Sequence, residues 1–129
     1  MKTEEKSGDE LRLIGQQLSS VLTAVDYITL KFVKYPLSST GAFADGALVD
    51  IEEGFEIAEN GETRIVRKSD GLGVFQKGSV NFINLIGRVI VNARSGSDGG
   101  LVLQFDNHAI ARLFINEQGF DSFSLTFKT

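Results

Sequence analysis

The sequence LIGRVIVNARSGSDGGLVLQFDNHAIARLFINEQGFDSFSLTF, residues 85–127, decides the fold of this chain. Apolar and polar side chains alternate within it with the two-residue period of β-strands. Asp106-Asn107-His108 interrupts the alternation, and Asn107 suits the left-handed position of a tight turn. The stretch predicts a four-stranded antiparallel meander, with strands at about residues 89–94, 101–105, 109–115 and 120–127.

The first half of the chain contains parts of the same stretch in the same order. Leu13-Ile14-Gly15 recurs as Leu85-Ile86-Gly87. The run Ile28–Phe32 corresponds to Leu101–Phe105, with apolar residues at the first, third and fifth positions of both. Because the matches keep their order, they indicate a duplicated β unit.

A third match extends the repeat. Ile51–Glu56 resembles Ile115–Asp121 but is one residue shorter. We therefore predict an internal repeat of two units, at about residues 10–67 and 79–128, joined by a glycine-rich linker at residues 68–78.

The first unit is expected to follow the same plan with more strands. A hairpin turns at Asp26, and a second one turns at Asn60-Gly61, which is the strongest short hairpin signal in the chain. The strands predicted in this unit are residues 16–25, 27–35, 47–52, 54–57 and 62–67.

A short helix is predicted at the start of each unit. Asp9 is a candidate N-cap for the first helix, and the second begins near Ser79. The apolar residues at helical spacing are Leu11, Ile14, Leu18 and Val21 in the first and Val80, Ile83 and Ile86 in the second.

These elements predict a mainly β protein of the β-rich α+β class. Neither meander can cover its own apolar face, so the two are expected to share one core as a sandwich or a partly open barrel. At 129 residues the chain has the length of one domain. We assign that domain to residues 10–129 and expect the charged residues 1–9 to form a disordered tail.

Composition excludes several classes of function. The chain has no cysteine, so it forms neither a disulfide nor a thiolate site. Its net charge of −4 and pI near 5.0 disfavour nucleic acid as a partner, because such a partner requires a basic surface. No apolar run approaches the roughly 20 residues of a membrane span, and the polar N-terminus lacks the apolar segment of a secretory signal. We expect a cytoplasmic protein without a cofactor.

An acidic run at residues 41–62 is the strongest chemical feature of the sequence. It is interpreted as a solvated face, and its functional alternatives are an anionic surface for a basic protein partner or a hard-cation or small-ligand site. In the ligand alternative, Asp50 and Glu52 share one face of a strand and act with Arg64 or Arg67. The run contains no basic residue, and its seven carboxylates are Asp45, Asp50, Glu52, Glu53, Glu56, Glu59 and Glu62.

Basic residues follow the acidic run directly. Arg64, Arg67 and Lys68 are interpreted as partners of Glu56 or Glu59 across neighbouring strands, and an anion site is the alternative.

The sequence shows no catalytic constellation. His108 is the only histidine, and its place in a turn predicts an exposed side chain rather than a catalytic base. No Gly-x-Ser-x-Gly elbow is present, and the glycine-rich segments 71–73 and 96–100 lack the Lys-Ser/Thr ending of a nucleotide loop. We therefore predict neither an enzyme nor a metal site.

Phenylalanine is the dominant aromatic residue, with ten copies, and most of them are expected in the core. Phe43 and Phe75 are predicted in loops, where they would line a pocket or a subunit interface. A homodimer formed through sheet edges or these loops is expected, because open edges otherwise stay exposed.

The order Leu-x-Gly, strand, turn, Leu-x-Leu-x-Phe, Asp-Asn in residues 85–127, and more loosely residues 13–57, resembles a group of small uncharacterised bacterial β proteins. Some of these proteins are grouped with immunity-type proteins of polymorphic toxin systems. The resemblance implies a small cytoplasmic β protein that binds another protein, and it implies no catalytic residue.

We therefore expect a non-enzymatic protein-binding module, immunity-like or regulatory, that uses the acidic face or the loop aromatics. A small-ligand or metal-binding β domain and a structural homo-oligomer subunit are the alternatives. The candidate interaction surface comprises Asp50, Glu52, Glu53, Glu56, Phe43, Phe75, Arg64 and Arg67.

Overall fold

The computed structural model describes residues 10–34, 44–96, 100–114 and 123–126. Its strands are β1 (Gln16–Thr23), β2 (Ile28–Lys34), β3 (Ala44–Ile51), β4 (Gly54–Glu59), β5 (Glu62–Arg67), β6 (Ile90–Ser95), β7 (Leu101–Phe105), β8 (Ile110–Leu113) and β9 (Phe123–Thr126). Its helical segments are the 3-10 turns η1 (Glu10–Leu13) and η2 (Lys68–Asp70) and the short α-helices α2 (Leu72–Lys77) and α3 (Val80–Ile83). The protein is mainly β, as predicted. The expected tail at residues 1–9 and the match at 115–121 lie outside the described residues.

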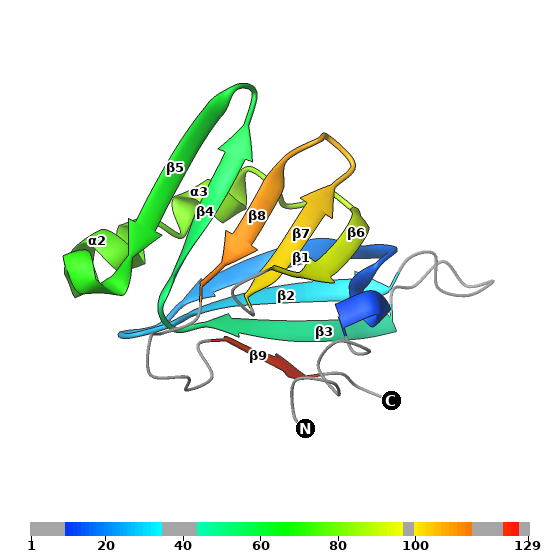
Figure 1. Ribbon diagram of the computed structural model, residues 1–129. Coiled ribbons are helices and arrows are strands. Elements are labelled where there is room, and N and C mark those ends of the chain that lie inside the picture. Colours follow the sequence, from blue (N-terminus) through cyan, green and yellow to red (C-terminus); the bar gives the residue numbers. More distant parts are fainter. Residues whose placement is uncertain (1–9, 35–43, 97–99, 115–122, 127–129) are drawn as a thin grey trace.

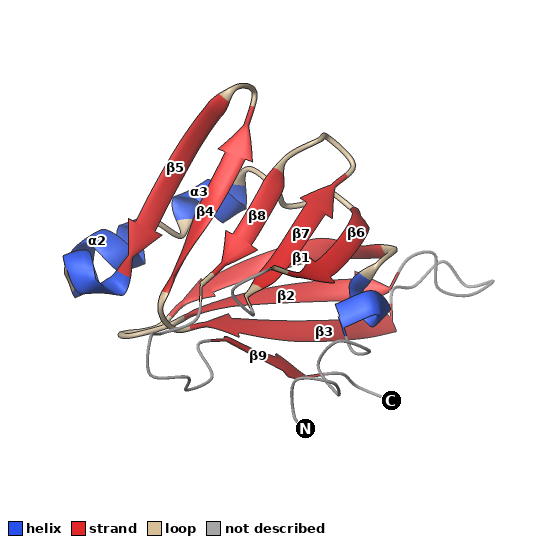
Figure 2. Cartoon of the chain, in the orientation of Figure 1, coloured by secondary structure: helices blue, strands red, loops and turns tan. Residues whose placement is uncertain are grey.

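The strands form two antiparallel sheets packed against each other (Figures 1 and 2). One sheet has the order β1-β2-β3-β9, and the other has the order β5-β4-β8-β7-β6. The sheets meet along one side, where Gln17 forms an isolated antiparallel bridge with Val89 and the Gly87 N–H donates to the Leu18 carbonyl at 2.8 Å. The two sheets form no closed barrel, so the sandwich is open at β5 and β9.

The predicted four-stranded meander at residues 85–127 is wrong in its last strand. β6, β7 and β8 follow one another in the five-stranded sheet, but β9 crosses to the other sheet and pairs with β3. The first half behaves in the same way, since β1, β2 and β3 form a meander and β4 crosses to pair with β8. Each crossing strand covers an edge that the other meander would leave open, which explains the exchange physically.

The core lies between the two sheets. Alternate residues of β2 and β7 supply much of it, and the Phe55 and Phe82 rings pack with their centroids 4.6 Å apart and their planes tilted by 59°. Each fully buried side chain of this size contributes about 1.5–3 kcal/mol to folding. The largest fully buried residues are Phe32, Phe55, Phe75, Phe82, Phe105, Leu13, Leu18, Ile28, Leu30, Ile51, Ile57 and Leu85.

The first predicted helix is reduced to a single turn, and the strand predicted at residues 16–25 is confirmed as β1. Only η1 is helical, and Leu18 and Val21 lie in β1. Gly15 has a φ of +92°, a left-handed conformation that ends the helical turn and that side chains with a β-carbon rarely adopt. β1 is then stabilised by seven register pairs with β2, which outweigh the local helical spacing.

The second predicted helix exists as α3, but the apolar residues named for its helical spacing are not the ones that are buried. Phe82 and Leu85 are fully buried, whereas Val80 is 56% exposed and Ile83 is 49% exposed. Burying the Phe82 ring removes more apolar area from water than burying Val80 or Ile83 would, so the helix turns Phe82 to the core.

Residues 68–78 are not a simple linker. They form η2 and α2, and α2 carries Phe75 into the core with no exposed surface. The prediction that Phe75 lies in a loop and faces a pocket or an interface is therefore wrong. The short helix α2 places the large apolar ring of Phe75 in the core, where it is removed from water.

A bulge in β3 is held by a buried polar side chain. The β2–β3 register shifts between Lys31 and Val33, and the Ala47 N–H donates to Gln16 Oε1 at 2.8 Å. Gln16 Nε2 in turn donates to the Arg12 carbonyl at 2.9 Å, so the side chain joins η1 to β3. A β-carbon at Gly46 would overlap Gln16 Oε1, so this position requires glycine.

Candidate functional site

The structure separates the carboxylates of the acidic run. Asp50 lies on β3 between the buried Val49 and Ile51, so its side chain is on the outer face of the four-stranded sheet. There it accepts a hydrogen bond from Thr29 Oγ1 at 2.6 Å. Glu56 lies on β4 between buried neighbours, so it is on the outer face of the other sheet. The two carboxylates therefore face opposite sides of the sandwich.

The proposed Asp50–Glu52 ligand site is not assembled. β3 ends at Ile51, so Glu52 lies in the bend that follows and does not share a strand face with Asp50. Within the described ranges, no group of three His, Cys, Asp or Glu side chains lies close enough to hold a metal ion. Arg64 and Arg67 belong to β5, the edge strand of the other sheet, and cannot complete a site at Asp50.

The basic residues also have partners other than the predicted ones. Arg64 forms an exposed ion pair of 2.9 Å with Glu62 of its own strand, not with Glu56 or Glu59. In the β4–β5 register the residue opposite Arg64 is Ile57, which leaves no carboxylate directly across from it. The guanidinium carbon of Arg67 lies 4.5 Å from the centroid of the Phe114 ring, a cation–π contact. Phe43 lies outside the described residues.

Lys68 and Gln76 link three connections at one end of the sandwich. Its backbone N–H donates to the Glu53 carbonyl at 2.9 Å, and its Nζ donates to the Asp26 carbonyl at 3.1 Å. Close by, Gln76 Nε2 of α2 donates to the Val25 carbonyl at 2.8 Å. The β1–β2 turn, the β3–β4 connection and α2 are therefore held side by side, as Figure 1 shows at its left.

This end carries exposed apolar side chains beside two carboxylates. Val25 is 70% exposed, Leu72 is 44% exposed and Tyr27 is 40% exposed. Leu72 lies one helical turn before Gln76, on the same side of α2. Glu52 and Glu53 form the β3–β4 connection at this end, directly after Ile51, the β3 partner of Ile28. We call Val25, Tyr27, Glu52, Glu53 and Leu72 the corner surface.

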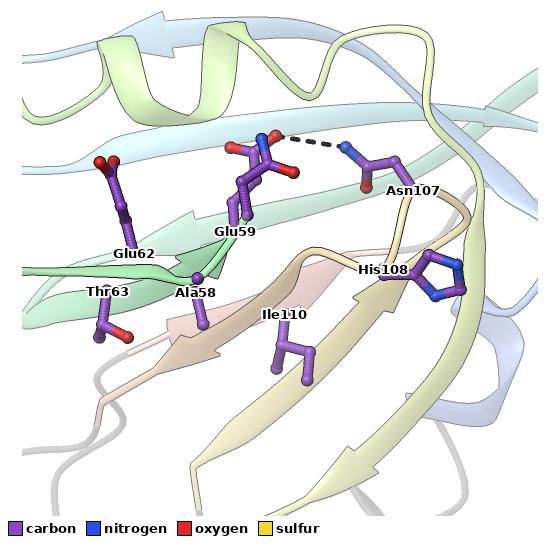
Figure 3. Close-up of a pocket in the computed structure, with 9 residues that line it drawn as sticks. Ala58, Glu59, Glu62, Thr63, Asn107, His108 and Ile110 are labelled. Atoms are coloured by element: carbon purple, nitrogen blue, oxygen red, sulfur yellow. Dashed lines mark hydrogen bonds between the residues drawn. The ribbon is translucent and has the colours of Figure 1, made fainter.

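A depression of about 450 Å³ lies at the opposite end of β4, between two hairpin turns (Figure 3). Asn107 Nδ2 donates to Glu59 Oε2 across it at 3.3 Å, and Asn107 Oδ1 accepts from the Ala109 N–H at 3.1 Å. The depression is lined by Ala58, Glu59, Asn60, Gly61, Glu62, Thr63, Asn107, His108 and Ile110. The depression is open to solvent and combines carboxylates, amides and a hydroxyl group with the apolar side chains of Ala58 and Ile110.

His108 is exposed in the β7–β8 turn, as predicted. His108, and not Asn107, occupies the left-handed position, with a φ of +73°. Asn107 instead closes the turn with its side chain, a local interaction typical of asparagine. Figure 3 shows the imidazole pointing away from Glu59, so the two form no acid–base pair. At the neighbouring tip, the predicted Asn60-Gly61 turn is confirmed by φ values of +54° and +82°.

The chain matches no protein-family model, no curated protein and no solved structure. The resemblance to small bacterial β proteins stays an expectation. In the part of the chain that the structure describes, no helix is both long enough and apolar enough to cross a membrane.

Sequence reasoning did not single out Val25, Tyr27 and Leu72. Val25 and Tyr27 flank the predicted hairpin turn at Asp26, and large apolar residues at a turn tip are a signal of exposed apolar surface. Leu72 was missed because residues 68–78 were expected to form a linker without a surface of its own.

Proposed function

We propose that this chain is a non-enzymatic protein-binding module that binds a basic partner through the corner surface. The carrying observation is the exposure of Val25, Tyr27 and Leu72 at the end of the sandwich where hydrogen bonds link the β1–β2 turn, the Glu52–Glu53 connection and α2. Apolar side chains that stay exposed next to charged ones are typical of interaction sites. A regulatory or immunity-like role in the cytoplasm fits this chemistry.

The apolar and acidic residues have different tasks in this proposal. Complete burial of one Val or Leu side chain is worth about 1.5–3 kcal/mol, so Val25 and Leu72, already partly covered, supply only part of a useful affinity. Tyr27 adds a ring with a hydroxyl group, a side chain enriched at the centres of interfaces. Glu52 and Glu53 select a positively charged partner and accelerate association.

The test uses tagged full-length protein and a lysate of the cells that make it. We expect a stoichiometric basic partner to be retained by the wild type and lost by the double variant Glu52→Lys/Glu53→Lys and by Leu72→Arg. Asp106→Lys is the control, because Asp106 is an exposed carboxylate in the β7–β8 turn, at the other end of the sandwich. Equal retention by all variants would contradict the proposal, as would a partner that only Asp106→Lys loses.

A second candidate function is recognition of a polar small molecule in the hairpin-end depression. Its volume of about 450 Å³ falls in the range of ordinary ligand pockets, and the Glu59–Asn107 hydrogen bond fixes two polar groups at its wall. A ligand of the folded state raises thermal stability by mass action. A panel of cationic and neutral metabolites should therefore raise Tm for the wild type and not for Glu59→Gln. A flat response over the whole panel would remove this candidate.

We also infer that the module is built from an internal repeat. When Leu13-Ile14-Gly15 is aligned with Leu85-Ile86-Gly87, Gln17 corresponds to Val89, and these two residues form the bridge between the sheets. The aligned Gly15 and Gly87 have φ values of +92° and +94°.

The hydrogen bonds at this bridge support the same inference. Gly15 donates its N–H to the Ile90 carbonyl at 2.7 Å, and Gly87 donates its N–H to the Leu18 carbonyl at 2.8 Å. In the same alignment Leu18 corresponds to Ile90, so the two bonds are reciprocal. A duplicated unit with an approximate twofold axis through the bridge would produce this geometry.

A further inference from the structure

The outer edge of the five-stranded sheet is β5, with the sequence ETRIVR. Among the described residues no strand pairs with its outer side, and Figure 1 shows it at the margin of the sheet. An open edge presents backbone donors and acceptors to any strand that can pair with them.

The backbone groups that face outward can be assigned. The Lys68 N–H points to β4, because it donates to the Glu53 carbonyl at 2.9 Å. Backbone groups alternate along a strand, so those of Val66, Arg64 and Glu62 also point to β4. The N–H and C=O groups of Thr63, Ile65 and Arg67 therefore point away from the sheet, and their side chains lie on its outer face.

We propose that β5 pairs antiparallel with β5 of a second copy of this chain, so that Ile65 lies opposite Ile65 of the partner subunit. The two five-stranded sheets then form one continuous sheet across a twofold axis. Thr63 lies opposite Arg67 of the partner subunit, and all three outward-facing residues of each strand use their N–H and C=O groups. The proposal concerns a surface other than the corner surface and stands independently of it.

The side chains favour this register. Ile65 is 54% exposed, and pairing covers it with an identical β-branched side chain, a favourable cross-strand pair. Glu62 comes to lie opposite Lys68 of the partner subunit, which gives two complementary charge pairs. Lys68 uses one Nζ donor on the Asp26 carbonyl and keeps its others for the partner.

The neighbouring register is disfavoured. Shifting the second strand by two residues places Arg67 opposite Gly61 of the partner subunit, which lies in the hairpin turn, so the backbone groups of Arg67 lose their strand partner. The same shift places Arg64 opposite Arg64 of the partner subunit. Like charges directly opposite each other destabilise a pair of strands. In the proposed register the side chains of β5 complement those of β5 in a second copy. For this reason we propose a second copy of the chain as the partner, and not an unrelated extended peptide.

The contact is small, so the dimer is expected to depend on concentration. A short strand pairing lies at the low end of specific interfaces, where complexes are transient. Light scattering combined with sedimentation over a concentration series should therefore show a monomer–dimer equilibrium with a dissociation constant on the order of micromolar.

Cysteine substitution tests the register, because the chain contains no cysteine of its own. Opposite residues in a hydrogen-bonded antiparallel pair have Cα atoms about 5.5 Å apart, which a disulfide can span. Ile65→Cys should form a covalent dimer on mild oxidation. Thr63→Cys is the matched control, since its sulfur atoms would be separated by about four residues along the strands, roughly 13 Å. The double variant Thr63→Cys/Arg67→Cys should again cross-link.

Ile65→Pro tests the backbone pairing. The Ile65 N–H points outward, so proline removes a donor to the second copy and leaves the β4–β5 ladder intact. We expect the dissociation constant to rise by about tenfold or more at unchanged far-ultraviolet circular dichroism. The proposal would be overturned if the wild-type protein stayed monomeric at a concentration about 100-fold above the expected dissociation constant. The proposal would also be overturned if Thr63→Cys formed a covalent dimer as readily as Ile65→Cys. This test does not depend on whether the proline variant folds.

Discussion

Replacing Gln16 with leucine should destabilise the protein well beyond the cost of a surface change. Gln16 is 4% exposed, and its Oε1 accepts from the Ala47 N–H at 2.8 Å. Leucine has a similar size but no acceptor. The bulge in β3 would then leave a buried N–H without its partner.

The magnitude follows from two hydrogen bonds. A buried N–H left without an acceptor costs about 1–3 kcal/mol, and loss of the Gln16 Nε2 bond to the Arg12 carbonyl costs about 1 kcal/mol. The additional apolar area of leucine offsets part of this loss. We expect the free energy of unfolding to fall by about 2–3 kcal/mol, which lowers Tm by roughly 8 °C for a domain of this length.

Gln17→Leu is the control for this substitution. Gln17 also donates from Nε2 to a backbone carbonyl, that of Gly87 at 2.8 Å, but this bond is solvent-exposed. Its loss should change the free energy of unfolding by about 0.5 kcal/mol or less.

Urea unfolding followed by far-ultraviolet circular dichroism measures both variants, because the chain has no tryptophan for a fluorescence assay. The denaturant slope should stay unchanged, so that the midpoint reports stability alone. Equal midpoints for Gln16→Leu and Gln17→Leu would refute the argument, since the bulge would then not depend on the buried acceptor.

Three further predictions, with five substitutions, test other parts of the structure. Phe75→Ala should lower the free energy of unfolding by about 3–5 kcal/mol in chemical denaturation, because the ring is fully buried. Leu72→Ala should lower it by less than about 1 kcal/mol. Equal losses for the two variants would contradict the inward orientation of Phe75. Gly54→Ala should lower Tm more than Gly61→Ala. A β-carbon at Gly54 would overlap the Val66 carbonyl oxygen, whereas a β-carbon at Gly61 would have no surrounding atom within 4 Å. The reverse order of Tm values would refute this prediction. Asn107→Ala should cost about 1 kcal/mol in thermal unfolding by releasing the Ala109 N–H, and an unchanged Tm would show that the turn closes without the side chain.

Much of the β structure could be predicted because its signals are local. The run Leu101–Phe105 alternates apolar residues, and β7 has the predicted bounds. Asn60-Gly61 forms a turn because both residues tolerate the left-handed backbone, a property of the residues themselves. The exposed position of His108 also followed from its place in a turn.

The errors occurred where tertiary packing outweighs local preference. The helical spacing of Leu11 and Ile14 predicted about two helical turns before Gly15, but only the single turn η1 forms. Phe75 looked like a loop residue because glycines surround it, yet α2 carries its ring into the core, where it is fully buried. The predicted Asp50–Glu52 ligand site is not assembled for the same reason, since proximity along residues 50–56 did not mean proximity in space.

The sequence by itself determined that this is a mainly β protein with tight glycine turns and without cysteine chemistry, because these properties depend on residue type and on spacing over a few positions. Only the tertiary structure decided that β4 and β9 exchange sheets, since unpaired edges attract strands from anywhere in the chain. It also decided on which side of the sandwich each carboxylate lies and which apolar side chains stay in water. Those relations depend on contacts between residues that are far apart in the chain, and no local pattern encodes them.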